Sequence, residues 1–241
     1  GQREVRGAGH SDQVYIHIEQ IPGGIGDPEA ETILVDLGMD GTVVELVDGA
    51  IDGAELYREW SLREREFRRG RTNMSDPKSS PPFQSYEQAW RRAFATTFAD
   101  LGIAGDAAAA AKACADTHSL RQPFADTAQA LEALALRTRI GVLSNADDRF
   151  LHGVIANQGW AFELVVSSEG ARAYKPDPRI FTAFCDLAGV KPQQVLYVGD
   201  SAYDDVHGAK LAGMSAVHIV RDQLTPGRTP PPEGAELLPP D

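Results

Sequence analysis

Five short apolar runs, separated by segments with helical patterns, constrain the fold of this chain more than any other feature. The runs cover residues 33–35, 140–143, 162–166, 195–198 and 216–220. Apolar runs that alternate with helices are typical of a parallel sheet whose strands are joined by crossover helices. The sequence therefore predicts an α/β fold built on a Rossmann-like parallel sheet. One crossover helix is well marked, since Asp177 can cap it, Pro178 fits its first turn and Gly189 follows its end.

The gap between the first two runs is too long for a single crossover helix, so it must hold an insert. Between residues 86 and 101, aromatic and leucine side chains recur at steps of four and three, which predicts an amphipathic helix of about four turns. Helices are expected at residues 54–69, 86–101 and 106–117. We call residues 47–126 the helical insert and expect it beside the carboxyl ends of the strands, where a lid can gate a site.

Glycine and proline content predicts where the N-terminal extension ends and where the C-terminal tail begins. Residues 1–31 are glycine-rich around a short alternating segment at 14–18, and are expected to form an extension with at most an edge strand. The core should comprise residues 32–46 and 127–222. Residues 223–241 contain six prolines, too many for a helix or a central strand, and should form a surface tail.

Composition excludes several classes of protein. The 241 residues carry 23 basic and 35 acidic side chains, a net charge of -12, which argues against a nucleic-acid partner. No window approaches the roughly 18 consecutive apolar residues that span a bilayer, and no signal-peptide pattern opens the sequence, so a cytoplasmic protein is expected. Cys114 and Cys185 lie in helix-like patterns and are interpreted as reduced core thiols. A monomer and a homodimer remain open.

Polar side chains follow four of the five runs. Because the carboxyl ends of parallel strands meet at one edge of a sheet, we expect these side chains to lie together. Three carboxylates there would repel by about 4 kcal/mol per pair at about 4 Å and an effective dielectric of about 20, so cations are needed. Lys175 supplies one charge, and Mg2+, a hard cation that prefers oxygen ligands, supplies two more. The residues are Asp36, Ser144, Asn145, Lys175, Asp200 and Asp205.

The four segments resemble the four motifs of the haloacid dehalogenase-like hydrolase superfamily. They read Val35-Asp36 with Asp40-Gly41-Thr42, Leu143-Ser144-Asn145, Lys175-Pro176-Asp177, and Val198-Gly199-Asp200-Ser201 with Asp205-Val206. The resemblance covers roughly residues 32–222, and the helical insert occupies the position of that superfamily's helical cap. It implies a Rossmann-like core with an inserted α-helical cap subdomain.

The resemblance also implies an activity, that of a Mg2+-dependent phosphatase acting on a small phosphorylated metabolite. Asp36 would attack phosphorus to give an aspartyl-phosphate, and Asp40 would serve as general acid. Such chemistry needs an in-line nucleophile and charge neutralisation. Phosphoryl binding would fall to Ser144, Asn145 and Lys175, and metal binding to Asp36, Asp200 and Asp205.

The first motif departs from the family pattern Asp-x-Asp-Gly-Thr, because Asp36 and Asp40 are four residues apart instead of two. If the strand anchors the match, Asp36 is the nucleophile and two residues have been inserted. If Asp40 anchors it, Gly38 stands at the nucleophile position and the chain is a catalytically impaired binding module. We favour the strand anchor, since the run at 33–35 leads directly into Asp36 and the other register would bury an acid within a central strand.

A further alternative is a 2-haloacid dehalogenase, whose insert is similar and whose carboxylate displaces halide without a metal. That branch lacks the paired acids of the last motif, which Asp200 and Asp205 retain, so the phosphatase is preferred.

Two other groups of side chains receive a structural interpretation. Arginines near the end of the first insert helix could bind an anionic substrate, but the glutamates between them favour a solvated helix face. The six histidines have no spacing typical of a metal site or a catalytic triad, and packing or solvent contact is preferred for them. The arginines are Arg63, Arg65, Arg68, Arg69 and Arg71.

Overall fold

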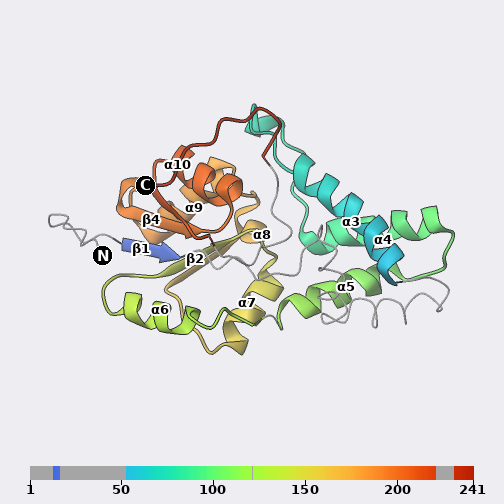
Figure 1. Cartoon of the computed structure of the whole chain (residues 1–241), viewed down its shortest axis with the longest axis horizontal. Coiled ribbons are helices and arrows are strands. Elements are labelled where there is room, and N and C mark those ends of the chain that lie inside the picture. Colours follow the sequence, from blue (N-terminus) through green and yellow to red (C-terminus); the bar gives the residue numbers. More distant parts are fainter. Residues whose placement is uncertain (1–12, 17–52, 121, 221–230) are drawn as a thin grey trace.

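The computed structural model describes residues 13–16, 53–120, 122–220 and 231–241, and shows strands at one end of the molecule and a group of helices at the other (Figure 1). Each pairing between the described strands is parallel: β1 with β4, β4 with β5, and β2 with β3. They form two sheets, in the orders β1-β4-β5 and β2-β3, which adjoin where β1 contacts β2. The predicted parallel α/β fold is confirmed. The strands are β1 (Gln13–Ile16), β2 (Gly141–Ser144), β3 (Leu164–Ser167), β4 (Val195–Gly199) and β5 (Ser215–His218).

The alternating segment expected as a possible edge strand does contain a strand, β1. β1 pairs with β4 and stands at one end of the order β1-β4-β5, and it also contacts β2. The first predicted run, residues 33–35, lies outside the described residues.

Helices lie on both sides of the strands, with α9 and α10 on one side and α6 and α7 on the other (Figure 1). The predicted signals of α9 are all present: Asp177 accepts a hydrogen bond from the backbone N–H of Arg179, Pro178 opens the helix, and Gly189 ends it at φ 68. Within the described part of the chain, no helix has the length and hydropathy that crossing a membrane requires. These helices are α6 (Thr127–Ala135), α7 (Asp148–Asn157), α8 (Ser168–Ala171), α9 (Pro178–Ala188) and α10 (Gly208–Leu211).

The helical insert contributes α3 (Gly53–Gly70), α4 (Tyr86–Leu101) and α5 (Ala107–His118), each within one residue of its predicted bounds. Its helix starts are set by local chemistry. Ser85 and Gln88 form a capping box at α4, and the Asp106 side chain accepts the backbone N–H groups of Ala108 and Ala109 at α5. A short 3-10 turn, η1 (Pro77–Ser79), lies between α3 and α4. The boundaries 47 and 126 stay a prediction.

Aromatic side chains join the helical insert to the sheet. Trp60 of α3 stacks on Phe94 of α4 with ring centroids 5.2 Å apart, and Trp90 of α4 stacks on Phe150 of α7 at 6.1 Å. All four rings belong to one buried cluster, and burying each stabilises the fold by about 1.5–3 kcal/mol. The helical insert and α7 therefore share a hydrophobic core. Cys114 lies in this cluster and Cys185 in a second one, both as free thiols, as predicted.

The end of the proline-rich tail lies along β5, the strand at one end of the sheet order. The backbone N–H of Asp241 donates to the carbonyl of Ala216 at 2.9 Å, and the Asp241 side chain accepts the Ala216 N–H at 2.8 Å. Lys210 pairs with the same carboxylate at 2.6 Å, and this hydrogen bond holds the pKa of Asp241 below its usual value. Residues 231–241 are thus tied to the fold by specific contacts.

Candidate active site

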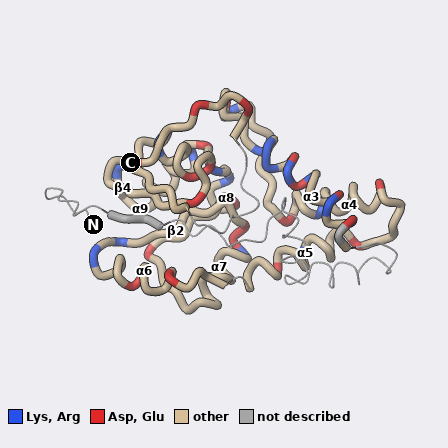
Figure 2. Tube along the Cα trace, viewed as in Figure 1, with Lys and Arg blue, Asp and Glu red and all other residues tan. Residues whose placement is uncertain are grey.

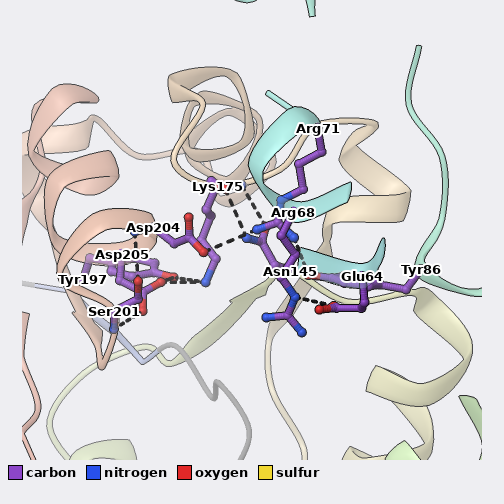
Figure 3. Close-up of polar contacts among 10 residues, drawn as sticks. All are labelled: Glu64, Arg68, Arg71, Tyr86, Asn145, Lys175, Tyr197, Ser201, Asp204 and Asp205. Carbon is purple, nitrogen blue, oxygen red and sulfur yellow. Dashed lines mark hydrogen bonds and ion pairs between the residues drawn. The ribbon is translucent and has the colours of Figure 1, made fainter. Parts of the chain in front are cut away.

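A buried ion pair lies at the carboxyl edge of the strands. The ammonium Nζ of Lys175 donates to Oδ1 of Asp205 at 2.6 Å, and both side chains are fully shielded from solvent (Figure 3). A buried charge is tolerated only when it is paired and hydrogen-bonded. The sequence predicted that these two residues would meet, and the structure brings them together.

The hydroxyl of Tyr197, in the middle of β4, contacts both members of this ion pair. It accepts from Lys175 Nζ at 3.1 Å and lies 3.2 Å from both Asp205 Oδ1 and the carbonyl of Leu143. The hydroxyl thereby links the end of β2 to the ion pair. Sequence reasoning missed Tyr197; the available signal was a polar atom inside an otherwise apolar strand, which must find a partner when buried.

The chain after β4 is shaped to present Asp205. The backbone N–H of Ser201 donates to Asp205 Oδ2 at 2.9 Å, and Ser201 caps the π-helical turn η3 (Ala202–His207). A Cβ atom at Gly199 would lie 2.5 Å from the Asp205 side chain, so only glycine fits there. Both carboxylate oxygens of Asp205 are therefore engaged by this chain's own donors.

Asn145 holds the backbone of Lys175. Its Oδ1 accepts the Lys175 N–H at 2.8 Å and its Nδ2 donates to the Lys175 carbonyl at 3.2 Å. Ser144, the preceding residue, is buried at the end of β2. Of the three residues predicted for substrate binding, Asn145 and Lys175 are thus in contact, and the Asn145 amide holds the backbone of Lys175.

The described residues do not reproduce the predicted Mg2+ site. Among them, no group of three His, Cys, Asp or Glu side chains could hold a metal ion. Both carboxylate oxygens of Asp205 accept hydrogen bonds, from Lys175, Tyr197 and the Ser201 N–H. The metal-binding roles of Asp200 and Asp205 stay predictions. Asp36, the third predicted ligand, lies outside the described residues together with Asp40, so their roles stay predictions.

Asp147 ties the loop after β2 to the helical insert. Its Oδ1 accepts the N–H of Tyr86 at 2.7 Å and its Oδ2 accepts that of Glu87 at 2.8 Å, so a core residue caps α4. The pKa of Asp147 is raised to about 6, chiefly because the carboxyl group is buried. The two N–H hydrogen bonds lower this pKa, whereas the charges of Glu169 and Glu87 raise it. The join between core and insert therefore contains a carboxylate that titrates near neutral pH.

We expect the free energy of unfolding to fall between about pH 4 and pH 6 through Asp147. Because its pKa is raised in the folded state, its contribution is complete below the unfolded value near 4 and is lost as the pH rises through about 6. This fall in the unfolding free energy with pH should disappear in Asp147→Asn. The difference in unfolding free energy between the parent and the variant should therefore change by up to about 3 kcal/mol across this range. Urea unfolding at a series of pH values measures it.

A matched control is Asp106→Asn, which removes the charge of an exposed N-cap of α5 and keeps a side-chain oxygen that can accept the same N–H groups. Its effect reports the loss of a carboxylate charge at an exposed helix start. If Asp147→Asn and the parent protein keep a constant difference in unfolding free energy from pH 4 to 7, the titration of Asp147 does not contribute to stability.

The arginines of α3 only partly match their predicted role. Arginines alternate with glutamates along this helix, as is typical of a solvated face (Figure 2). Arg63 pairs with Asp100 and Arg68 with Glu64. Arg71, just past the helix, is instead buried, because it reaches Asp204 of the core at 3.3 Å. The solvated-face interpretation is wrong for this residue, since a helical pattern does not reveal the partner that covers its last turn.

A pocket of about 670 Å3 opens between α3, α4 and the loop before α4. Its volume lies in the range of small-molecule sites. Aromatic and cationic side chains contribute to its wall, and Tyr174, next to Lys175 in sequence, is one of them. These residues include Arg63, Phe67, Arg71, Phe83, Arg92 and Tyr174.

Curated relatives of the chain are haloacid dehalogenases. It is 33% identical over 141 residues to an (S)-2-haloacid dehalogenase of Xanthobacter autotrophicus, a match that covers 56% of this chain and 54% of that protein. It is 35% identical over 117 residues to haloacetate dehalogenase H-2 of Moraxella sp. (strain B), covering 45% and 51%. The matched part therefore spans about half the length of these relatives.

Solved structures that resemble this chain include a haloacid dehalogenase as well. The L-2-haloacid dehalogenase of Xanthobacter autotrophicus superposes with a TM-score of 0.60 at 25% identity, covering 87% of this chain and 78% of that one. A putative HAD hydrolase of Bacillus subtilis bound to magnesium reaches a TM-score of 0.67 at 14% identity, which shows the fold alone.

These relatives overturn the phosphatase prediction and favour the dehalogenase alternative. The phosphatase prediction had relied on the paired acids of the last motif, and one of them, Asp205, forms an ion pair with Lys175 in the structure. The resemblance itself is confirmed, since the model of the haloacid dehalogenase-like hydrolases matches residues 31–213. The chain belongs to the haloacid dehalogenase-like hydrolase family.

Proposed function

We propose that this protein hydrolyses the carbon–halogen bond of a small 2-haloacid. A carboxylate oxygen of Asp36 attacks C2 and the halide leaves with the bonding electron pair, giving an ester. Water then attacks the ester carbonyl, which releases the 2-hydroxyacid and a proton and restores the Asp36 carboxylate. A halogenated carboxylic acid thus replaces the phosphorylated metabolite expected from the sequence.

The observation that carries this proposal is the fully buried Lys175–Asp205 pair at the strand edge, in a chain whose relatives are dehalogenases. An ammonium fixed there stabilises an ionised nucleophile and an anionic substrate without a metal ion. Ser144 lies at the end of the neighbouring strand and offers a hydroxyl to the substrate carboxylate. The departing halide needs no proton, so displacement places no demand on a general acid at Asp40.

The aromatic pocket beside Tyr174 also supports a substrate with an apolar part. An enclosed approach limits the water that reaches the site to what the hydrolysis of the ester carbonyl needs. We infer that substrate enters from the side of α3 and α4.

Chloride release from (S)-2-chloropropionate in excess EDTA tests the proposal. Displacement at C2 followed by attack at the ester carbonyl inverts C2 once, so the product should be (R)-lactate. A single turnover in H2(18)O should place the label in the Asp36 carboxylate, which peptide mass spectrometry detects.

Two matched substrates serve as controls. (R)-2-chloropropionate measures the enantiomer preference, and an aryl phosphate with Mg2+ measures phosphatase activity. Chloride release that stops in EDTA, or label that appears in lactate but never in Asp36 during the first turnover, would contradict the mechanism.

A further inference from the structure

Arg71 is a buried cation that reaches from the helical insert into the core. Its guanidinium side chain is 3% exposed, and its Nη2 lies 3.3 Å from Oδ2 of Asp204, which is 6% exposed. Its Nη1 donates to the Tyr86 hydroxyl, and its guanidinium carbon lies 4.4 Å from the ring centre of Tyr174. Burial lowers the pKa of Arg71, but Tyr86 and Asp204 more than compensate, so the pKa is raised and the guanidinium remains charged.

These contacts fall on the sequence neighbours of the active-site ion pair. Tyr174, under the guanidinium, precedes Lys175, and Asp204, which accepts its hydrogen bond, precedes Asp205. Figure 3 shows the Arg71 and Lys175 side chains meeting the adjacent acids Asp204 and Asp205. One side chain of the helical insert therefore touches both segments that supply the pair.

The anchoring is directional as well as electrostatic. A planar guanidinium that stacks on one ring and donates from two nitrogens fixes the relative position of three groups, which an ammonium could not do. Tyr174 is held from its other end too, because its hydroxyl donates to the Gln84 carbonyl at 2.6 Å. Moving the helical insert away from the core would break the contacts of Arg71 with Asp204 and Tyr174, and that of Tyr174 with Gln84, together.

We propose that Arg71 is a positioning residue that couples closure of the helical insert to the placement of Lys175 and Asp205. The inference rests on the proposed dehalogenase function for its kinetic part. Arg71 acts through Tyr174 and Asp204 and does not itself hold the substrate. The active-site pair reaches its reactive geometry when the insert is seated on the core.

Steady-state kinetics on (S)-2-chloropropionate provide the first test. Arg71→Met should lower kcat by about 10- to 100-fold while KM changes little, since small misplacements of catalytic groups have effects of this size. Arg69→Met, which removes an exposed arginine of the same helix end, should leave both constants unchanged. A large rise in KM at unchanged kcat would mean that Arg71 binds substrate directly, and would overturn the proposal.

A double variant separates positioning from simple stability. Arg71→Met leaves the buried Asp204 without its guanidinium, whereas Arg71→Met with Asp204→Leu removes both charges and should recover the melting temperature. The proposal requires that kcat stays low in this stable double variant. Recovery of kcat together with stability would overturn it.

Hydrogen exchange tests the coupling without any substrate. The result of this test therefore does not depend on the proposed dehalogenase function. The Lys175 amide donates to Asn145 Oδ1 and the Asp205 amide to the Ser201 carbonyl. Both should exchange at least about tenfold faster in Arg71→Met and at the parent rate in Arg69→Met. Unchanged exchange at these amides would refute the coupling, whereas failure of halide release in the parent protein would refute only the proposed function.

Discussion

Replacing Asp36 with Asn is expected to lower kcat for chloride release by at least about 10,000-fold, the scale seen when a nucleophile is removed. An amide is a much weaker nucleophile than a carboxylate, and no other group can form the ester. A chloride electrode with (S)-2-chloropropionate measures the loss. Circular dichroism verifies that the variant is folded.

Asp40→Asn is the matched control, since it changes the same atoms four residues away. Its effect should be small, because halide departs without a proton. If Asp40→Asn abolishes activity and Asp36→Asn retains it, Asp36 is not the nucleophile and the strand anchor of the first motif is wrong.

Lys175→Met should destabilise the protein by about 3–5 kcal/mol, the scale of breaking a buried ion pair. The substitution leaves the fully buried Asp205 carboxylate without its ammonium partner. Urea unfolding followed by tryptophan fluorescence measures the effect. Activity should also be lost, because the same ammonium neutralises the nucleophile and the substrate.

Lys112→Met is the control for stability, since Lys112 forms a comparable pair with Asp116 at an exposed position. Exposed pairs of this kind contribute about 0–1 kcal/mol. Lys175→Met with Asp205→Leu should regain most of the lost stability and none of the activity. If Lys175→Met is no less stable than Lys112→Met, the burial of the pair does not govern the stability of this region.

Local signals in the sequence predicted helices better than the places where they meet. α4 begins and ends as predicted, because Ser85, Gln88 and Gly102 carry the chemistry of both ends within the helix itself. The start and the end of α9 were likewise indicated by Pro178 and Gly189. Strand bounds moved by up to two residues. The run at 162–166 became β3 at Leu164–Ser167, because Phe162 packs against the aromatic cluster instead of entering the sheet.

Contacts between distant segments had no local signal. Asp147 caps a helix that starts 61 residues earlier, and Arg71 meets Asp204 across 133 residues. Nothing near either residue in sequence indicates its partner. The gathering of Ser144, Asn145 and Lys175 was predictable, because strand ends of a parallel sheet share an edge. The need for cations beside the acids was also recognised, but the cation that Asp205 meets is Lys175 itself.

The contact between Asp241 and Ala216 has a consequence for self-association. β5 stands at the outer end of the strand order, where an unpaired N–H and carbonyl would offer another molecule a template for strand addition. Asp241 occupies both groups of Ala216. The prolines before it, Pro239 and Pro240, have no N–H, so the covering segment cannot itself pair fully with a further strand. The tail thus covers the edge of β5 at Ala216, and removing it would expose an N–H and a carbonyl to which a strand of another molecule could pair.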